Sequence, residues 1–242
     1  MESYRDRIYQ YYVTAMERDY TISRDSLRSR EPYLRRIIRR HFPQDHKARI
    51  LDLGCGHGTL LHFCRLEGYD QVSGVDRSPQ QAAKARELGI EGVQQGDLMT
   101  TLHALPDASQ DVVIAFDVIE HFSKEELLPF IDEVRRVLRP GGRWLIHVPN
   151  GESPFFGRIR YGDFTHENIF TRNSLAQVLM ASGFREVRSF EDKPIIHGLK
   201  SLVRSVLWTG IRAGLLVYLA AETGAFDRGT ILTQNFLAVA TR

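Results

Sequence analysis

Cysteine is scarce in this chain of 242 residues. The two cysteines, Cys55 and Cys64, do not have the number or spacing of a disulfide framework. The first residues, Met1 to Asp6, also lack the apolar run of a secretory signal. Both absences favour a reducing compartment. We therefore expect a cytoplasmic protein without structural disulfides.

Net charge and internal repetition are also low. The formal net charge is +2 at pH 7, which gives no overall attraction to nucleic acid, and no repeat or low-complexity tract is present. We therefore expect no nucleic-acid partner. Charge is distributed unevenly, however, because residues 24–49 contain nine Lys or Arg and only three acids.

A helix is expected to start at Ser29–Pro32, with the proline in its first turn. Its apolar residues should form a buried side and its arginines a basic, exposed side. The buried set is Leu34, Ile37 and Ile38, and the basic set is Arg35, Arg36, Arg39 and Arg40. Such a basic side is usually only solvated surface. Contact with an anionic substrate or with a membrane surface is the alternative.

Apolar runs and helical patterns alternate along most of the chain. Strands are expected at 49–53, 72–76, 92–97, 111–116, 143–149, 184–190 and 229–240. Helices are expected from Thr59 and at 78–88, 123–138 and 171–184. This repetition implies an α/β fold with a doubly wound, mostly parallel sheet and right-handed crossovers. The length suits one domain with additions.

A glycine turn follows the first expected strand. Gly54, Gly56 and Gly58 separate that strand from the next helix, and such a turn lets a ligand approach the backbone and the helix N-terminus. The spacing differs from the dinucleotide fingerprint, because the sixth position counted from Gly54 is Thr59 rather than glycine. An NAD-binding protein is therefore disfavoured.

Acidic residues end three of the expected strands, at Asp52, Asp76 and Asp97. Asp76 lies about 20 residues past the turn, where a carboxylate can accept hydrogen bonds from both hydroxyls of a ribose. Each acid, taken singly, can also be explained as the N-cap of the following helix. Three such acids at one edge of the sheet favour a nucleotide-like ligand instead.

The pattern Asp-x-Gly-x-Gly-x-Gly at 52–58 resembles motif I of the class I S-adenosylmethionine (AdoMet)-dependent methyltransferases, and Leu-x-Pro-Gly-Gly at 138–142 resembles the same family. The resemblance implies a seven-stranded sheet in which the last strand, antiparallel, lies between the fifth and the sixth. It also implies AdoMet as the cofactor. The cofactor-binding residues would be Asp52, Gly54, Cys55, Gly56, Asp76, Arg77, Asp97, Leu98 and Asp117.

The fourth expected strand ends in Asp-x-x-Glu-His at 117–121, at the edge where parallel sheets place their active sites. This motif and Thr-His-x-x-x-Phe-Thr at 165–171 resemble the branch that includes the ubiquinone-type O-methyltransferases. The resemblance implies that His166 returns over the cleft to face His121. We expect His166, His121 and Asp117 to be catalytic, because an alcohol must lose its proton to become a good nucleophile.

Glu120, His121 and His166 are also candidate metal ligands, since a divalent ion lowers the pKa of a bound hydroxyl. Some relatives with Glu-x-x-Glu-His are reported to use such an ion. The first position here is the shorter aspartate, so metal use stays open. In the simplest alternative, Glu120 and His121 only begin a helix near solvent. His57 and His147 are expected to be structural.

The N-terminal segment 2–20 is rich in tyrosine at roughly helical spacing. We expect an amphipathic helix that either lies over the cofactor cleft or packs on the edge of the sheet. The chain is accordingly divided into an N-terminal helical cap, residues 1–44, and a methyltransferase domain, residues 45–242, with an insert at 192–228.

The insert replaces a hairpin loop, and connections of this length are usually functional. Its segment 195–221 is apolar and basic, with two aromatic residues. Lys200, Arg204 and Arg212 interrupt it, so we expect that it does not span a bilayer. Its composition is compatible with a position in the membrane interface. The alternatives are a helical pair packed on the domain and the face of a homodimer.

The acceptor is expected to be a sugar hydroxyl on a polyprenyl-linked or lipopolysaccharide-type glycan. This expectation comes from a looser resemblance of the insert to methyltransferases of bacterial surface-polysaccharide clusters. A small phenolic or quinone-like acceptor is the alternative. A non-catalytic subunit that binds AdoMet or a nucleotide belongs to a different class, and the intact acids and two candidate bases speak against it.

Overall fold

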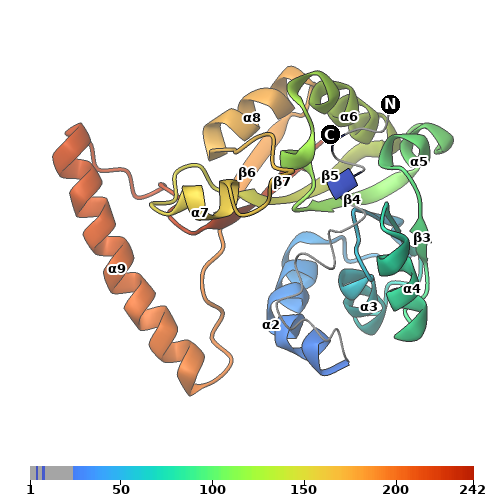
Figure 1. Ribbon diagram of the computed structural model, residues 1–242, viewed down its shortest axis with the longest axis horizontal. Coiled ribbons are helices and arrows are strands. Elements are labelled where there is room, and N and C mark those ends of the chain that lie inside the picture. The colour runs from blue at the N-terminus through green and yellow to red at the C-terminus, as the bar shows by residue number, and fades with distance from the viewer. Residues whose placement is uncertain (1–3, 5–6, 9–23) are drawn as a thin grey trace.

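The computed structural model describes residues 4, 7–8 and 24–242. Its centre is a seven-stranded sheet with the order β3-β2-β1-β4-β5-β7-β6 (Figure 1). Strands β1 to β5 are parallel, and β7 runs antiparallel between β5 and β6, which confirms the predicted topology. The strands are β1 Ile50–Leu53, β2 Val72–Asp76, β3 Val93–Gln95, β4 Gln110–Phe116, β5 Leu138–Pro149, β6 Glu186–Glu191 and β7 Asn235–Thr241.

Helices cover both faces of the sheet (Figure 1). Side chains of α2, α3 and α4 form the core on one face, and those of α5, α6 and α8 form the core on the other. The helices are α2 Arg24–His41, α3 Thr59–Leu66, α4 Pro79–Glu87, α5 Leu98–Ala104, η1 Ile119–His121 (a 3-10 turn), α6 Lys124–Val137, α7 Phe156–Arg160, α8 Arg172–Ala181 and α9 Leu199–Thr223.

Strand β4 lies in the middle of the sheet, and its residues 110–115 are all buried. A strand with parallel neighbours and helices on both faces needs apolar side chains on both sides. Val113 and Ala115 accordingly pack into the core under α5 and α6, and Val112 and Ile114 into the core under α2 and α3. The carboxyl end of β4 therefore opens at the same edge as the ends of β1 and β2.

Local signals in the sequence begin the helices. Ser78 caps α4 by accepting a hydrogen bond from the Gln81 N–H, with Pro79 at the first helical position. Ser123 and Thr171 begin α6 and α8 with capping boxes. These three predicted helix starts are confirmed.

Helix α2 corrects one prediction. It begins at Arg24 rather than at Ser29, so Pro32 lies inside the helix and not in its first turn. The reason is Leu27, which is buried in the same core as Leu34 and extends the apolar side of the helix toward the N-terminus. That core also includes residues of β1 and α3, so α2 packs directly on the sheet.

The last strand is shorter than expected. It begins at Asn235, whereas the alternating pattern predicted a strand over 229–240. Arg212 of α9 donates hydrogen bonds to the carbonyls of Arg228 and Thr230, at 2.9 and 3.0 Å. The backbone before β7 therefore binds the insert instead of continuing the sheet.

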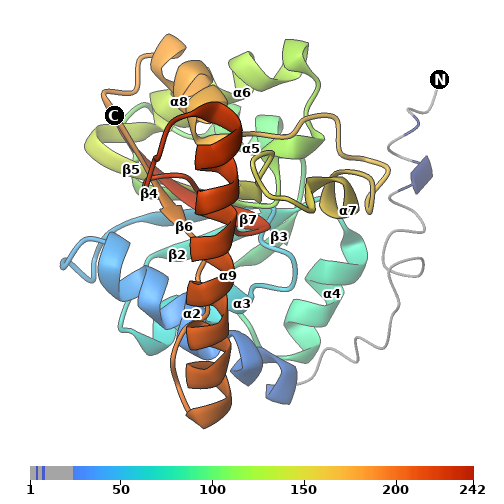
Figure 2. The same cartoon turned by 90° about the vertical axis from the view of Figure 1, so that its left-hand side faces the viewer.

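The insert forms one continuous helix, α9, and not a helical pair. It lies beyond the β6 edge of the sheet, joined to the domain by 192–198 and 224–234 (Figures 1 and 2). Its most apolar window has a mean hydropathy of 1.4, and 6% of that window is buried. By length and composition alone it is able to cross a membrane. The expectation that it does not span a bilayer therefore stays a prediction.

The predicted N-terminal helix 2–20 falls almost entirely outside the described residues. Within it, the Tyr4 hydroxyl donates a hydrogen bond to the Glu167 carboxylate, and its ring meets that of Phe164 edge-on at 6.5 Å. Tyr4 therefore contacts the loop that carries His166.

Candidate active site

The glycine turn after β1 has a backbone that other residues do not adopt easily. Gly54 and Gly58 have φ angles of +75° and +81°, in the left-handed region that favours glycine. A Cβ atom at Gly54 would lie 2.5 Å from Val118, and one at Gly58 would lie 2.6 Å from Val93. The turn therefore packs closely against β3 and the segment after β4, and leaves no room for a side chain at Gly54 or Gly58.

Asp76, the last residue of β2, is tied to this turn. Its carboxylate accepts hydrogen bonds from the backbone N–H groups of Gly56, at 2.8 Å, and Ser78, at 2.9 Å. Asp52 is buried nearby, and burial together with the charge of Asp76 raises the pKa of Asp52 to about 8. Two carboxyl groups this close favour a cationic ligand, because a positive charge beside them stabilises their ionised forms.

Asp117 follows β4 with a φ of +55°, which is uncommon for a residue with a side chain. Nδ1 of His147 donates to its carboxylate at 2.8 Å, and Nε2 of the same ring lies 3.5 Å from Asp192. Burial opposes a charged His147, but the two carboxylates prevail and raise its pKa to about 10. Burial raises the pKa of Asp117, and the His147 charge outweighs it, so the pKa falls below the ordinary value. The two groups thus form an ion pair at the sheet edge.

A second group of titratable side chains lies in η1 and in the loop before α8. Glu120, His121 and His166 offer possible ligand atoms that all lie within 4.8 Å of one another. The rings of His121 and His166 face each other, with centroids 4.8 Å apart and planes at 65°. The chain fold thus places His166 beside Glu120 and His121, which lie about 45 positions earlier in the sequence.

Hydrogen bonds determine which nitrogen of each histidine carries the proton. The Thr165 hydroxyl donates to Asp163 at 2.6 Å, so its oxygen accepts from Nδ1 of His121 at 2.8 Å. Nδ1 of His166 lies 3.1 Å from the Ile159 carbonyl, an acceptor only, and is therefore protonated as well. In each neutral ring Nε2 holds the lone pair. Burial and the charge of His166 lower the pKa of His121, which favours its neutral form.

Glu120 is fully buried, and neither of its carboxylate oxygens receives a hydrogen bond from a residue that the structure describes. Burial, followed by the charge of Asp117, raises the pKa of Glu120 well above its ordinary value. A buried carboxyl group without a partner is costly. A divalent cation held together with His121 and His166 would satisfy it, so the residues present fit a metal. The alternative in which Glu120 lies near solvent is wrong.

The residues of this site lie within a domain that known proteins share. A family model described as a methyltransferase domain matches residues 26–189. A probable S-adenosylmethionine-dependent methyltransferase of Mycolicibacterium smegmatis is 33% identical over 137 residues, which cover 56% of this chain and 51% of that protein. The chain belongs to the S-adenosylmethionine-dependent methyltransferase family. A ubiquinone biosynthesis O-methyltransferase of Azorhizobium caulinodans is 32% identical over 128 residues, which cover 49% of each protein.

The chain spans about half the length of these curated relatives. A solved structure of an S-adenosylmethionine-dependent methyltransferase from Archaeoglobus fulgidus is 23% identical and superposes with a TM-score of 0.66. The match covers 90% of this chain and 97% of that one, which confirms the Rossmann-like methyltransferase fold. AdoMet is therefore the cofactor of this methyltransferase domain, as motif I implied.

The three strand-end acids of the methyltransferase domain differ in their local roles. Asp97 is the N-cap of α5 and accepts from the Thr100 N–H at 2.9 Å, so the capping explanation holds for this acid. Ser78 and Gly58 occupy the N-cap positions of α4 and α3. The capping explanation therefore fails for the other two acids, and a ligand remains the better reason for their position. Contact of Asp97 with AdoMet stays a prediction.

The remaining predicted cofactor residues lie at the same edge of the methyltransferase sheet. The Cys55 N–H donates to the Val75 carbonyl at 3.1 Å, which joins the turn to β2. Arg77 is exposed after β2, and Leu98 is half-buried at the start of α5. Their contacts with AdoMet stay predictions.

Two residues at the site, His147 and Arg30, were not predicted from the sequence to be functional. His147 was expected to be structural, yet it connects Asp117 of the methyltransferase site to the base of the insert. Phe116 pairs with His147 across β4 and β5, and this pairing places the next residue, Asp117, beside the His147 ring. The strand register that sets this pairing is not encoded in local sequence patterns. Arg30 of α2 also faces this edge, where its charge opposes the effect of burial on the pKa of Asp52.

Proposed function

We propose that the protein transfers the methyl group of AdoMet to a sugar hydroxyl on a polyprenyl-linked or lipopolysaccharide-type glycan. The observation that carries O-methylation is the cluster of Glu120, His121 and His166, whose ligand atoms lie within 4.8 Å of one another. Such groups take up or polarise the proton that an alcohol loses when its oxygen attacks.

In this reaction the acceptor oxygen attacks the methyl carbon of AdoMet in line with the carbon–sulfur bond. An oxygen–carbon bond forms and the carbon–sulfur bond breaks, so the sulfonium leaves as a neutral thioether. The hydroxyl proton goes to Nε2 of His166. The protein mainly aligns the two reactants, and a positioned base contributes typically about 10²–10⁴ in rate. His121, kept neutral by burial and by His166, offers a second lone pair.

In the alternative metal route, Glu120, His121 and His166 would hold a divalent ion, because imidazole nitrogen with a carboxylate oxygen suits several such metals. The lone pair on Nε2 of His166 would then bind the ion and would not take up the proton. A bound ion supplies one effect, a lower pKa of the acceptor hydroxyl. Asp163 orients His121 through the Thr165 hydroxyl, at 2.6 and 2.8 Å. This is the arrangement that carboxylates commonly form behind metal-binding histidines.

The faces of α9 support a lipid-linked acceptor. Its polar residues Ser201, Ser205 and Arg212 are buried or half-buried toward the domain. Its apolar side chains are exposed on the outer side: Leu199, Leu202, Val203, Val206, Leu207, Ile211, Val217 and Tyr218. Large exposed apolar surfaces mark contact with a membrane or a partner. The exposed Lys200 and Arg204 lie on the same helix and suit anionic headgroups.

In this proposal α9 lies along the membrane surface and does not cross it. A helix of 25 residues is about 37 Å long, so crossing would place its ends on opposite sides of the bilayer. Its two neighbouring strands meet at the base of the insert, where Glu191 pairs with Phe236. The segment 224–234 would have to return through the hydrocarbon without helical hydrogen bonds, which membranes do not allow.

A small phenolic or quinone-like acceptor is the second candidate. The observation that favours it is the similarity to proteins named ubiquinone biosynthesis O-methyltransferases. This acceptor explains the histidine cluster equally well but gives α9 no role. A subunit that binds AdoMet without transferring its methyl group is the candidate from a different class.

The test uses radiolabelled AdoMet with two acceptor pools, a catechol in solution and the lipid-linked glycans extracted from the membranes of the source organism. We expect label in the glycan lipid fraction, and its loss with His166→Ala. Label in catechol alone would support the second candidate and reject the first. Label in neither pool, with AdoMet binding intact by calorimetry, would reject both and leave the non-catalytic subunit.

A further inference from the structure

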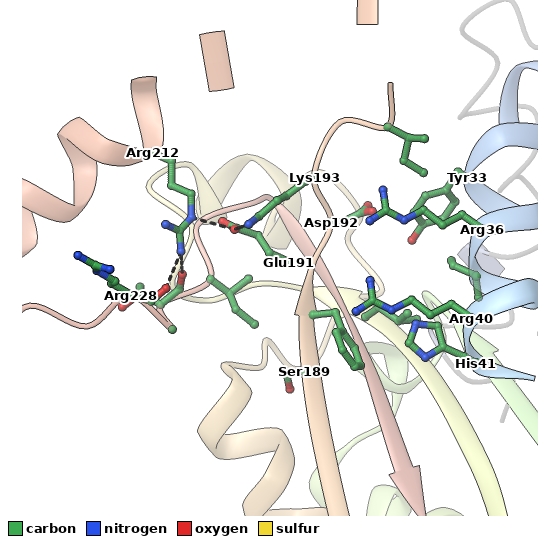
Figure 3. Close-up of a pocket in the computed structure, with 17 residues that line it drawn as sticks. Tyr33, Arg36, Arg40, His41, Ser189, Glu191, Asp192, Lys193, Arg212 and Arg228 are labelled. Atoms are coloured by element: carbon green, nitrogen blue, oxygen red, sulfur yellow. Dashed lines mark hydrogen bonds and ion pairs between the residues drawn. The ribbon is translucent and has the colours of Figure 1, made fainter. Parts of the chain in front are cut away.

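A recess lies at the carboxyl end of β6, beside α2 and apart from the glycine turn and the histidine cluster. It is a cavity of about 350 Å³ between α2, β6 and the insert (Figure 3). None of the glycines of the turn, the strand-end acids or the histidine cluster lines it. Its size is at the lower end of the range for small-molecule sites. The proposed methyl transfer does not use this cavity.

Positive charge enters the cavity from two sides. Arg36 and Arg40 reach into it from α2, and Lys193 and Arg212 lie across from them (Figure 3). Glu191 lies between the second pair and binds both, at 3.3 Å from the Lys193 nitrogen and 2.8 Å from the Arg212 guanidinium. One carboxylate thus serves two cations on that side.

The four arginines at 35–40 of α2 separate into a pair bound to the carboxylates of Glu31 and Glu67 and a pair without an ion-pair partner among the described residues. Arg35 and Arg39 both bind the Glu67 carboxylate of α3. Arg36 and Arg40 have no ion-pair partner among the residues that the structure describes, although Arg40 lies 5.2 Å above a phenyl ring of β6. Like charges at positions i and i+4 of a helix destabilise it. An anion between Arg36 and Arg40 would remove that repulsion.

The same excess of positive charge affects the pKa of the neighbouring His41. Its pKa is lowered to about 4, first by burial and then by the charges of Arg40, Arg143 and Arg36. His41 is therefore neutral at pH 7. Asp192 is the other acid of the cavity wall, and it lies 3.5 Å from the His147 ring.

We propose that this cavity binds a phosphate or diphosphate group between Arg36, Arg40 and Lys193. Guanidinium groups match phosphate oxygens with paired N–H donors, and a lysine adds a point charge. The cavity opens between α2 and the helix α9 that the proposed function places on the membrane. The phosphate of a lipid-linked acceptor and a free phosphate compound share this chemistry. The assignment to the acceptor rests on the proposed function, whereas the anion site does not.

Calorimetry on the full chain with inorganic pyrophosphate tests the site. We expect measurable binding, at least about tenfold weaker in the double variant Arg36→Gln/Arg40→Gln. The matched control is Arg39→Gln, on the same helix but bound to Glu67 and outside the cavity, which should leave the affinity within about twofold. Lys193→Gln, on the opposite wall, provides a second variant if the double substitution disturbs α2.

Geranyl diphosphate distinguishes the two sources. A lipid-linked source predicts that it binds at least about tenfold more tightly than pyrophosphate, because its prenyl chain gains apolar contact. Equal affinities would assign the site to a free phosphate compound. Absence of binding for both probes, or equal weakening by Arg39→Gln, would overturn the site. These titrations contain neither AdoMet nor an acceptor hydroxyl, so their failure leaves the proposed methyl transfer intact.

Discussion

Nδ1 of His147 in β5 donates a hydrogen bond to the carboxylate of Asp117, 2.8 Å away at the end of β4. Asp117 has a left-handed backbone, a conformation that persists only when the surroundings hold it. Burial works against this imidazolium, yet the neighbouring carboxylates keep its pKa near 10. The ion pair therefore helps to hold the residue that begins the Asp-x-x-Glu-His motif.

The first prediction concerns the pH dependence of this pair. The folded protein keeps a proton on His147 that the unfolded chain releases above about pH 6.5. The stability that the pair adds is therefore complete below that pH and is lost as pH rises toward the folded pKa of about 10. Denaturant unfolding should show stability falling over this interval, by at most about 1.4 kcal/mol per pH unit for one proton.

His147→Gln is the control for that measurement. It should lower the free energy of unfolding at pH 6 by roughly 1.5–3 kcal/mol, as expected for a hydrogen bond to a charged group. It should also flatten the slope between pH 6.5 and 10. A variant whose stability falls as steeply as that of the wild type would show that other groups cause the pH dependence.

The second prediction separates two of the strand-end acids. Asp76→Ala should weaken AdoMet binding at least about tenfold, because charge-assisted hydrogen bonds to the ribose are lost. Asp97→Ala should in addition cost about 1 kcal/mol of stability, because it removes the N-cap of α5. Calorimetry and thermal unfolding measure the two effects. Unchanged AdoMet affinity in Asp76→Ala, or tighter binding of NAD than of AdoMet, would contradict the cofactor assignment.

The third prediction concerns the base. His166→Ala should reduce turnover by about 10²-fold or more without changing AdoMet affinity. Thr165→Val removes the acceptor that holds His121 Nδ1, so it should reduce turnover by a smaller factor and leave AdoMet affinity alone. His103→Ala, at an exposed position of α5 outside both the cluster and the glycine turn, is the control. Full activity of His166→Ala would exclude this residue as the base.

The fourth prediction concerns metal binding. If Glu120 is a ligand, the purified protein should contain a divalent metal, and Glu120→Gln should bind it at least about tenfold more weakly. Chelation should then abolish methyl transfer, and addition of the metal should restore it. If no metal binds, Glu120→Gln should be neutral or stabilising, because a buried carboxyl group without a partner is removed. Mass spectrometry for metals and thermal unfolding distinguish the two results.

The fifth prediction concerns α9. The protein should sediment with anionic liposomes at low salt and be released as salt rises, because screening weakens its electrostatic attraction. Lys200→Glu/Arg204→Glu should weaken this binding by about 30-fold or more, at about 1 kcal/mol for each lost charge. Arg212 is left unchanged, because it binds Glu191 and two backbone carbonyls inside the domain.

Lys124→Glu is the control for the liposome experiment. Lys124 is exposed at the start of α6, and its substitution reverses a positive charge outside α9. Its binding should match the wild type. AdoMet affinity should be unchanged in both variants. A wild-type protein that does not sediment with anionic liposomes at low salt would reject the membrane role of α9.

Local patterns were sufficient for most of the fold and for the cofactor edge. Strands and helices are distinguished by the different periods of their apolar residues. Caps such as Ser123 and Thr171 lie within a few residues of the N–H groups that they cap, and the glycine turn is one contiguous segment. The expected partners of AdoMet lie at or next to strand ends, so the parallel topology gathers Asp52, Asp76 and Asp117 at one edge. Local patterns in the sequence therefore determined the strands and most of the helices, and the resemblance of motif I implied the strand order and the candidate cofactor residues.

Only the tertiary structure decided which distant side chains form ion pairs and which are buried. The pairing of His147 with Asp117 depends on strand register, and the burial of Glu120 depends on the loop packed above η1. The division between neutralised and partnerless arginines on α2 depends on the position of Glu67. The contact of Arg212 with Glu191 determines which side of α9 faces the domain and which side faces outward. Each depends on packing between segments far apart in the chain, which periodicity and spacing do not encode.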